Sequence, residues 1–132
     1  MTTASRLGVV RLSVVLVASA RTASRLEEAL RSLMIPTMLS DGCLDCSTWV
    51  APDWTVHYLE DWATEAHMRD RVRSDVFTRL LSVIEASEEQ PRVQFDFVTK
   101  TRGLDYIEEV RQHSEPPARP ASVMGESNVK AE

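Results

Sequence analysis

The order of its periodic segments is the feature that most restricts the fold of this chain. Apolar residues recur at helical spacing over 24–34 and 74–86, and they alternate as in strands over 8–19, 43–50, 54–62 and 92–99. The resulting order is strand, helix, two strands, helix, strand. It predicts the split β-α-β arrangement of a ferredoxin-like α+β domain, with a four-stranded antiparallel sheet and helices on one face.

Local signals mark the ends of these segments. A capping box that begins at Ser24 is expected to start the first long helix, and Ser74 is expected to cap the second. Pro36 is expected to kink or end the first helix. Thr64 is a candidate cap for a short helix before Ser74, and a last short helix is expected over 104–111.

The chain length suits one domain with one modest core, since it has 132 residues. We expect this domain to span 8–111 and to include the short C-terminal helix. Residues 1–7 are polar and are expected to be flexible. Residues 112–132 are rich in Pro, Ser and charged residues, a composition that predicts a disordered tail.

Composition argues against two classes of partner. The net charge of -5 disfavours a nucleic-acid binder, and no apolar run approaches the length of a membrane span. The N-terminal apolar stretch resembles a signal peptide, but Arg11 interrupts it and its residues alternate as in a strand. We therefore expect a cytoplasmic protein, in which Cys43 and Cys46 are reduced thiols on opposite faces of a strand.

The alternation also predicts self-association. The helices cover one face of the predicted sheet, whereas apolar residues on its other face would contact water in a single copy. A second copy that packs its own sheet there would bury them. The pattern therefore predicts a homodimer, a dimeric α+β barrel.

The sequence resembles the antibiotic biosynthesis monooxygenase family. Four stretches carry the resemblance, in matching order and spacing over about residues 9–111: Gly42-Cys43-Leu44, Glu60-Asp61-Trp62, Arg73-Ser74-Asp75-Val76-Phe77, and Arg102-Gly103-Leu104 with Ile107 and Arg111. The resemblance implies an enzyme that oxidises a small aromatic, quinol or polyketide-like substrate with O₂. It also implies that no metal, flavin or haem takes part, because the deprotonated substrate reduces O₂ itself.

Two positions depart from relatives of this family. Family members often carry a His three residues before the helix Ser, where this chain has Arg71, and guanidinium cannot accept a proton at neutral pH. Haem-degrading relatives place their iron ligand where this chain has Leu81, which cannot ligate iron. The resemblance therefore implies no haem here, and a proton acceptor other than the residue at 71.

The candidate site residues follow from these considerations. His67 and His57 are alternative proton acceptors, and Arg71 is a candidate to hold an anionic oxygen. The candidate substrate-binding residues are aromatic: Trp62, Phe77 and Tyr58. Each has a structural alternative, since Trp62 could only pack in the core and His67 could only be a surface residue. His57 and Asp61 share a face of one strand at a distance too long for pairing.

A second class of function stays open from the sequence. Few polar residues converge, which also suits a non-catalytic dimer of the same fold that binds a small apolar molecule or a protein partner. The apolar face of the last helix could serve either the dimer or such a partner.

Overall fold

The computed structural model describes residues 8–112, so the expectations for 1–7 and for 113–132 lie outside the described residues. The chain divides into two compact units, residues 1–101 and 102–132. Within its described residues, 8–101, the first unit contains the sheet and four helices.

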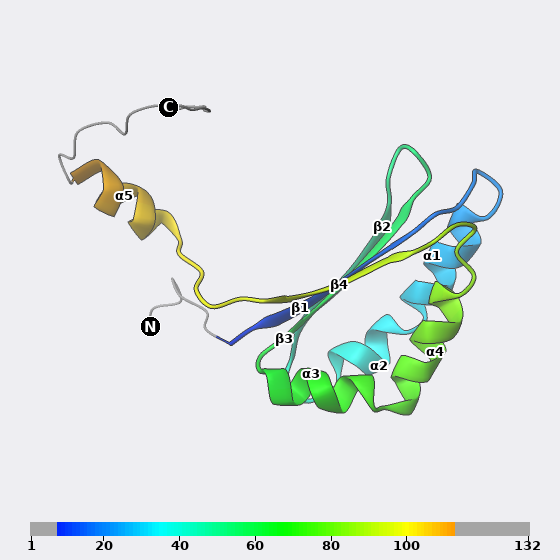
Figure 1. Cartoon of the computed structure of the whole chain (residues 1–132), viewed down its shortest axis with the longest axis horizontal. Coiled ribbons are helices and arrows are strands. Elements are labelled where there is room, and N and C mark those ends of the chain that lie inside the picture. The colour runs from blue at the N-terminus through cyan, green and yellow to red at the C-terminus, as the bar shows by residue number, and fades with distance from the viewer. Residues whose placement is uncertain (1–7, 113–132) are drawn as a thin grey trace, which may run out of the picture. The chain divides into compact units, whose positions relative to one another are not determined.

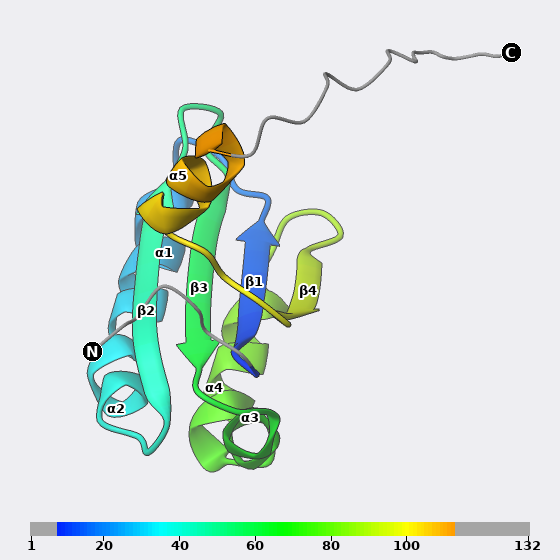
Figure 2. The same ribbon diagram turned by 90° about the vertical axis from the view of Figure 1, so that its left-hand side faces the viewer.

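Four antiparallel strands form the sheet. They are β1 (Val10–Leu16), β2 (Cys43–Val50), β3 (Val56–Trp62) and β4 (Arg92–Phe97), and their order across the sheet is β2-β3-β1-β4 (Figure 2). The two middle strands in sequence form a hairpin, as predicted. This order confirms the ferredoxin-like fold class.

The helices of this unit lie on one face of the sheet (Figure 1). They are α1 (Ala23–Arg31), α2 (Met34–Met38), α3 (Glu65–Val72) and α4 (Asp75–Ile84). The core fills the space between these helices and the sheet, and its strand residues include Leu12, Leu16 and Val56. These strand residues are even-numbered, because side chains of one strand face alternate in sequence.

Two of the three predicted caps are confirmed. The hydroxyl groups of Thr64 and Ser74 accept hydrogen bonds from the backbone N–H groups of the third residues that follow them. The cap predicted at Ser24 is wrong, because α1 already begins at Ala23. Pro36 lies in the first turn of α2, where its missing N–H costs no helical hydrogen bond.

A β-bulge changes the expected direction of one cysteine. Cys43 pairs with Trp62 and Cys46 with Glu60, and the register shifts between them at residue 44. Because Trp62 and Glu60 share the helix-side face, both cysteines face the helices. The expectation of opposite faces is wrong because it assumed an uninterrupted strand. Both thiols are free, and burial raises the pKa of each.

The face of the sheet without helices is mixed rather than apolar. Arg11 and Asp61 form a two-point ion pair there, with N–O distances of 2.8 and 2.9 Å. Apolar side chains on this face include Val15 and Leu59, and Trp49 stacks on His57. The predicted second copy would therefore meet a face with polar and apolar parts.

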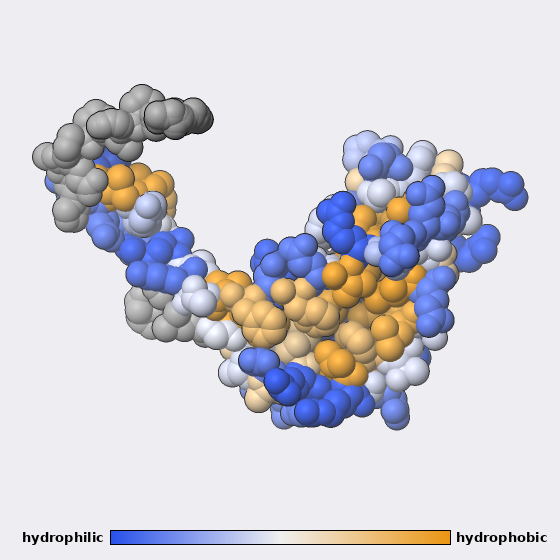
Figure 3. Space-filling view, viewed as in Figure 1, coloured by the Kyte–Doolittle hydropathy of each residue, from blue (hydrophilic) through white to orange (hydrophobic). Residues whose placement is uncertain are grey.

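Exposed apolar side chains also gather along β4. Figure 3 shows an apolar surface there, and the exposed residues on β4 and the neighbouring helices are Val93, Phe95, Phe97, Val72 and Leu81. The β4 residues point to the helix side of the sheet, because Phe95 pairs with Leu12 and Phe97 with Val10. The helices do not reach far enough to bury them.

The second unit contains α5 (Leu104–Gln112). Its apolar residues are all at least half exposed: Leu104, Tyr106, Ile107 and Val110. Arg102 holds the start of this helix through ion pairs with Asp105 and Glu109. Among residues 8–112, no helix is long and apolar enough to cross a membrane.

Candidate functional site

A carboxylate that is closed off from solvent lies at the centre of the buried polar groups. Strand β3 places Tyr58, Glu60 and Trp62 on the helix side, and all three are at most 1% exposed. The alternation of the strand that buries the two aromatic rings therefore buries the charge between them. Such burial requires hydrogen-bonding partners for both carboxylate oxygens.

Four donors satisfy these two oxygens. Trp62 Nε1 donates to Glu60 Oε1 over 2.8 Å, and Arg71 Nε donates to the same oxygen over 3.1 Å. Arg71 Nη2 donates to Oε2 over 2.5 Å, and the Tyr58 hydroxyl donates to Oε2 in a short hydrogen bond. A carboxylate is an acceptor only, so this set of partners matches its ionised form.

Arg71 reaches this cluster from α3. Its Nη2 also donates to the Thr37 hydroxyl of α2 over 2.9 Å, and its guanidinium carbon lies 5.9 Å from the Trp62 ring centroid and 5.7 Å from that of Phe77. Burial is the largest influence on the Arg71 pKa and lowers it, but the hydrogen bonds and charge of Glu60 outweigh burial and raise the pKa overall. Arg71 is therefore a permanent cation here.

Tyr58 and Cys46 complete the cluster as uncharged groups. Burial, followed by the charge of Glu60, raises the pKa of the Tyr58 hydroxyl well above its usual value. Burial also raises the pKa of Cys46 to about 11, against a smaller lowering by its hydrogen bond with Tyr58. Neither group is suited to accept a proton from a substrate at neutral pH.

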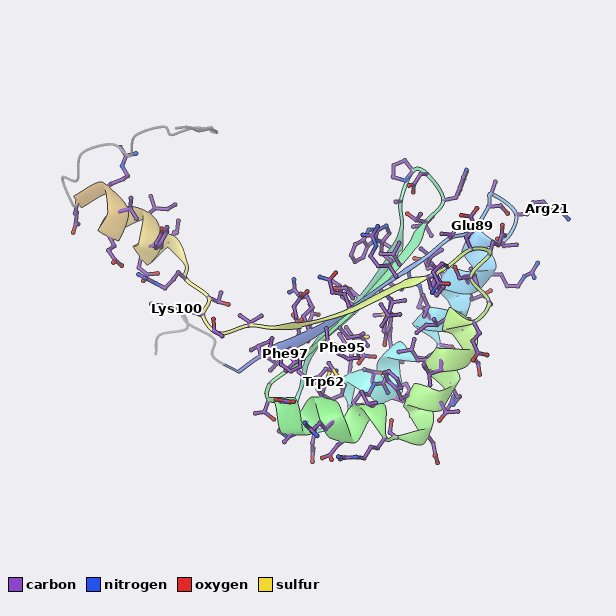
Figure 4. The ribbon with its side chains drawn as sticks, viewed as in Figure 1. Arg21, Trp62, Glu89, Phe95, Phe97 and Lys100 are labelled. Carbon is purple, nitrogen blue, oxygen red and sulfur yellow. The ribbon has the colours of Figure 1, made fainter. Side chains whose placement is uncertain are left out.

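One side of this cluster borders a small cavity of about 200 Å³. Its lining comes from the end of β3, from α3, from the start of α4 and from the loop before β2: Ser40, Asp41, Trp62, His67, Asp70, Arg71, Ser74 and Val76. Figure 4 shows Trp62 on the helix side of the sheet, where this cavity lies. Within residues 8–112, Arg71 Nη1 has no protein hydrogen-bond partner. Arg71, one of the residues that line the cavity, therefore keeps an unpartnered Nη1 amino group with two N–H bonds.

His67 is held at the cavity by two neighbours. Its Nδ1 lies 2.8 Å from the Thr64 hydroxyl, and that hydroxyl also accepts the His67 backbone N–H over 3.1 Å. Gly42, which has a φ of 88°, lies directly against the imidazole: a Cβ atom at this position would be 2.2 Å from His67 Cγ. A glycine is needed at this turn both for its backbone and for the space it leaves to the ring.

The candidate residues from the sequence fall into two groups. Trp62, His67 and Arg71 line the same cavity, and Phe77 and Tyr58 contact Arg71 from behind it. His57 lies on the opposite face of the sheet, where its ring centroid is 5.1 Å from that of Trp49 and its Nε2 is 2.9 Å from the Thr55 hydroxyl. Asp61 pairs with Arg11 rather than with His57, as the strand spacing predicts.

Sequence reasoning missed Glu60, Thr37 and Gly42 as parts of the site. A signal for Glu60 was present, because it falls between Tyr58 and Trp62 on the buried face of its strand, where a charged residue needs a partner. Thr37 had no such signal, since it meets Arg71 only through tertiary packing. In residues 8–112, no group of three His, Cys, Asp or Glu side chains is arranged to bind a metal.

Two larger hollows lie along β4. Their volumes are about 430 and 300 Å³, and both include Glu65 and Phe97 in their linings. Their linings are largely apolar and lack a buried polar group aimed inward. The smaller cavity, with its convergent polar groups, is therefore the better candidate for chemistry.

Known structures share the fold of this chain. A protein from Shewanella oneidensis is 18% identical, with 71% of this chain and 94% of that chain covered and a TM-score of 0.63. A conserved protein from Methanosarcina mazei is 17% identical, with 69% of this chain and 93% of that chain covered and a TM-score of 0.61. An antibiotic biosynthesis monooxygenase is 17% identical, with 68% of this chain and 98% of that chain covered and a TM-score of 0.57. No family model and no curated protein matches the sequence. The chain thus has the α+β fold of the antibiotic biosynthesis monooxygenase structures.

Proposed function

We propose that this protein is a cytoplasmic monooxygenase that oxidises a small aromatic, quinol or polyketide-like compound with O₂ and without a cofactor. The observation that carries the proposal is the grouping of Trp62, Arg71 and His67 around one small cavity. Together they offer an apolar indole wall, of which only 1% is exposed in the absence of a ligand, an N–H donor and a base. The fold shared with an antibiotic biosynthesis monooxygenase supports the same reaction class.

The proposed reaction begins with a proton transfer to His67. If Nδ1–H donates to the Thr64 hydroxyl, Nε2 has a free lone pair and can take the proton of a substrate hydroxyl. The Arg71 Nη1 group then donates to the phenolate oxygen that forms. Arg71 itself cannot be the base, because its pKa is raised.

The electrons come from the substrate. The phenolate gives one electron to O₂, and the resulting radical and superoxide join through a new C–O bond at the ring carbon para to the hydroxyl. His67 returns its proton to this peroxide. Loss of the ring C–H proton and cleavage of the O–O bond then give a quinone carbonyl and water. Phenol plus O₂ thus becomes quinone plus water, a balance that needs no added reductant.

Oxygen uptake with a panel of phenols and quinols, in buffer freed of metal ions, tests this function. His67→Gln should lower kcat/KM by about 100-fold or more, since a general base contributes on this order. His57→Gln is the matched control, because His57 lies on the other face of the sheet, and it should change the rate less than about twofold. Absence of uptake with every substrate, or equal losses in both variants, would contradict the proposal.

Binding without turnover is the second candidate function. It is favoured by the polar cluster behind the cavity, where Glu60, Tyr58 and Arg71 largely satisfy one another. A protein of this kind would bind phenols in calorimetry and show no oxygen uptake with them. Binding with uptake selects the enzyme, and binding alone selects this candidate.

We also propose that the protein acts as a homodimer. The sheet face without helices supports this proposal, because Trp49 is 43% exposed there and no helix among residues 8–101 covers that face. Trp is enriched in the buried parts of protein interfaces. The two-point Arg11–Asp61 pair on the same face satisfies its own charges and could be covered by a second copy.

A further inference from the structure

The charge of Arg71 is cancelled where it meets the cavity. Its guanidinium and the Glu60 carboxylate form an ion pair whose side chains are 2% and 0% exposed. Little of either group is exposed to solvent that would screen it, so the two charges act on the cavity as a dipole and not as a free cation. A ligand in the cavity therefore meets an arginine without meeting a net positive charge.

The other charged groups at the cavity do not restore a positive potential. Asp41 and Asp70 both line it, and Asp70 has only a long contact of 3.5 Å with the exposed Arg73. The N-terminus of α4 adds a partial positive charge at Ser74, but Asp75 in the first turn offsets it. Apart from Arg71, no Lys or Arg of the described residues lines the cavity.

The cavity nevertheless keeps a hydrogen-bond donor. Arg71 Nη1 is unpartnered among residues 8–112, although its side chain is almost fully buried. A buried donor without a partner costs stability, and a ligand oxygen would satisfy it. With a volume of about 200 Å³, the cavity is smaller than the sites of drug-sized ligands, so this oxygen belongs to a small molecule.

We propose that Glu60 is a specificity-determining residue that makes this cavity select uncharged hydroxyl- or carbonyl-bearing aromatic rings and reject aromatic carboxylates. The inference rests on the proposed function for the location of the site. Beyond that function, it specifies that the preferred ligand is uncharged and that Glu60 determines this preference. Glu60 does not touch the ligand and acts only by neutralising Arg71.

Calorimetric binding of a matched ligand pair tests the inference. We would use 2-naphthol and 2-naphthoate near neutral pH, where the first is uncharged and the second is ionised. Without O₂ in the buffer no turnover occurs, so a failure of the oxygenase proposal leaves this measurement intact. The wild-type protein should bind naphthol at least about tenfold more tightly than naphthoate, a ratio that corresponds to about 1.4 kcal/mol.

Glu60→Gln should reduce or reverse this preference by about tenfold or more, because Gln keeps the size and one acceptor oxygen but leaves the Arg71 charge uncompensated. Circular dichroism would establish that the variant is folded. If it is not, Asp41→Asn with Asp70→Asn provides the second test: both residues line the cavity, and their loss should raise naphthoate affinity severalfold without raising naphthol affinity.

Three outcomes would overturn the inference. The first is that the wild type binds naphthoate as tightly as naphthol or more tightly, and the second is that it binds neither ligand. The third is an unchanged ratio of naphthol affinity to naphthoate affinity in a folded Glu60→Gln variant or, where that variant does not fold, in the double Asp variant. By contrast, naphthol binding without oxygen uptake would overturn the oxygenase proposal alone.

Discussion

The guanidinium of Arg71 and the carboxylate of Glu60 meet at two points inside the domain, with an Nε–Oε1 distance of 3.1 Å and an Nη2–Oε2 distance of 2.5 Å. This pair ties α3 to β3 behind the candidate site. Because neither side chain reaches solvent, each depends on the other for its charge to be tolerated in the core.

Removal of one partner should therefore destabilise the domain strongly. Arg71→Leu leaves the Glu60 carboxylate buried without its cation, and breaking a buried pair in this way costs about 3–5 kcal/mol. Urea unfolding measures the loss. The double variant Arg71→Leu with Glu60→Leu should recover part of it, because no unpaired charge remains.

Arg73→Ala is the matched control for this measurement. Its partner contact is long and both side chains are well exposed, so the free energy of unfolding should change by less than about 0.5 kcal/mol. A cost for Arg71→Leu as small as that of the control would contradict the role of the buried pair.

The sequence predicted the fold well because the fold depends on periodicity. The alternation along β1 and β3 and the apolar stripes of α1 and α4 are local patterns, and they kept their predicted faces in the structure. The exception is Leu81, which was expected in the core and is 44% exposed. The bulge at residue 44 was not predictable in this way, because one extra residue in a strand leaves no mark in the pattern of Cys43 and Cys46.

The site was predictable only in part. Trp62, His67 and Arg71 share a cavity because β3 ends where α3 begins, and their closeness in sequence already pointed to it. The partners of Arg71 were harder to foresee. Thr37 is 34 residues away and reaches Arg71 only because the fold brings it within hydrogen-bonding distance of the guanidinium.

A series of glycine variants should separate steric contact from backbone strain. Gly42→Ala introduces both effects, since the backbone φ is 88° and the new Cβ would lie 2.2 Å from His67 Cγ. Gly8→Ala introduces backbone strain alone, since its φ is 83° and no neighbouring atom lies closer than 4.0 Å to the new Cβ. Strain of this kind costs about 1–3 kcal/mol. Gly42→Ala should therefore lower the free energy of unfolding more than Gly8→Ala does, because it adds the steric contact to the strain, and it should also displace the His67 ring.

Gly103→Ala is the control for this series, because its φ is ordinary and its nearest neighbour would be 3.7 Å away. Thermal unfolding ranks the three variants, and the His67 ring signals in NMR report displacement of the imidazole. Equal costs for Gly42→Ala and Gly8→Ala, with an unmoved ring, would contradict the packing of Gly42 against His67.

Tryptophan fluorescence should report the state of the site. Trp62 is 1% exposed, whereas Trp49 and Trp54 are 43% and 47% exposed. A variant with Trp49→Phe and Trp54→Phe leaves Trp62 as the only indole, and its emission should be blue-shifted and weakly quenched by acrylamide. Strong quenching in the folded variant would mean that Trp62 is accessible to solvent.

Stability should fall at alkaline pH because of Cys46. The folded pKa of about 11 lies above the ordinary value of 9.0, so the folded protein keeps a proton that the unfolded chain releases. Stability from this group is complete below pH 9.0 and is lost as pH rises toward 11. The full loss corresponds to about 2–3 kcal/mol, and the raised pKa of Tyr58 acts in the same direction.

Urea unfolding at about pH 8 and about pH 10.5 measures this loss. Cys46→Ala should lower stability at the lower pH through lost packing and should show a smaller further decrease at the higher pH. Cys43→Ala is the comparison, because that thiol is only half-buried. If all three proteins lost the same stability between the two pH values, Cys46 would not be the group responsible.

Dimer formation should depend on the sheet face without helices. Trp49→Lys places a charge beside His57 on that face and should shift the protein toward monomer in sedimentation equilibrium. Trp54→Lys is a matched control, because Trp54 has similar exposure but lies in the turn before β3. Phe97→Lys tests the other apolar surface, along β4. If Phe97→Lys disrupts the dimer and Trp49→Lys does not, the interface lies at β4. A wild-type protein that stays monomeric at high concentration would exclude both surfaces as dimer interfaces.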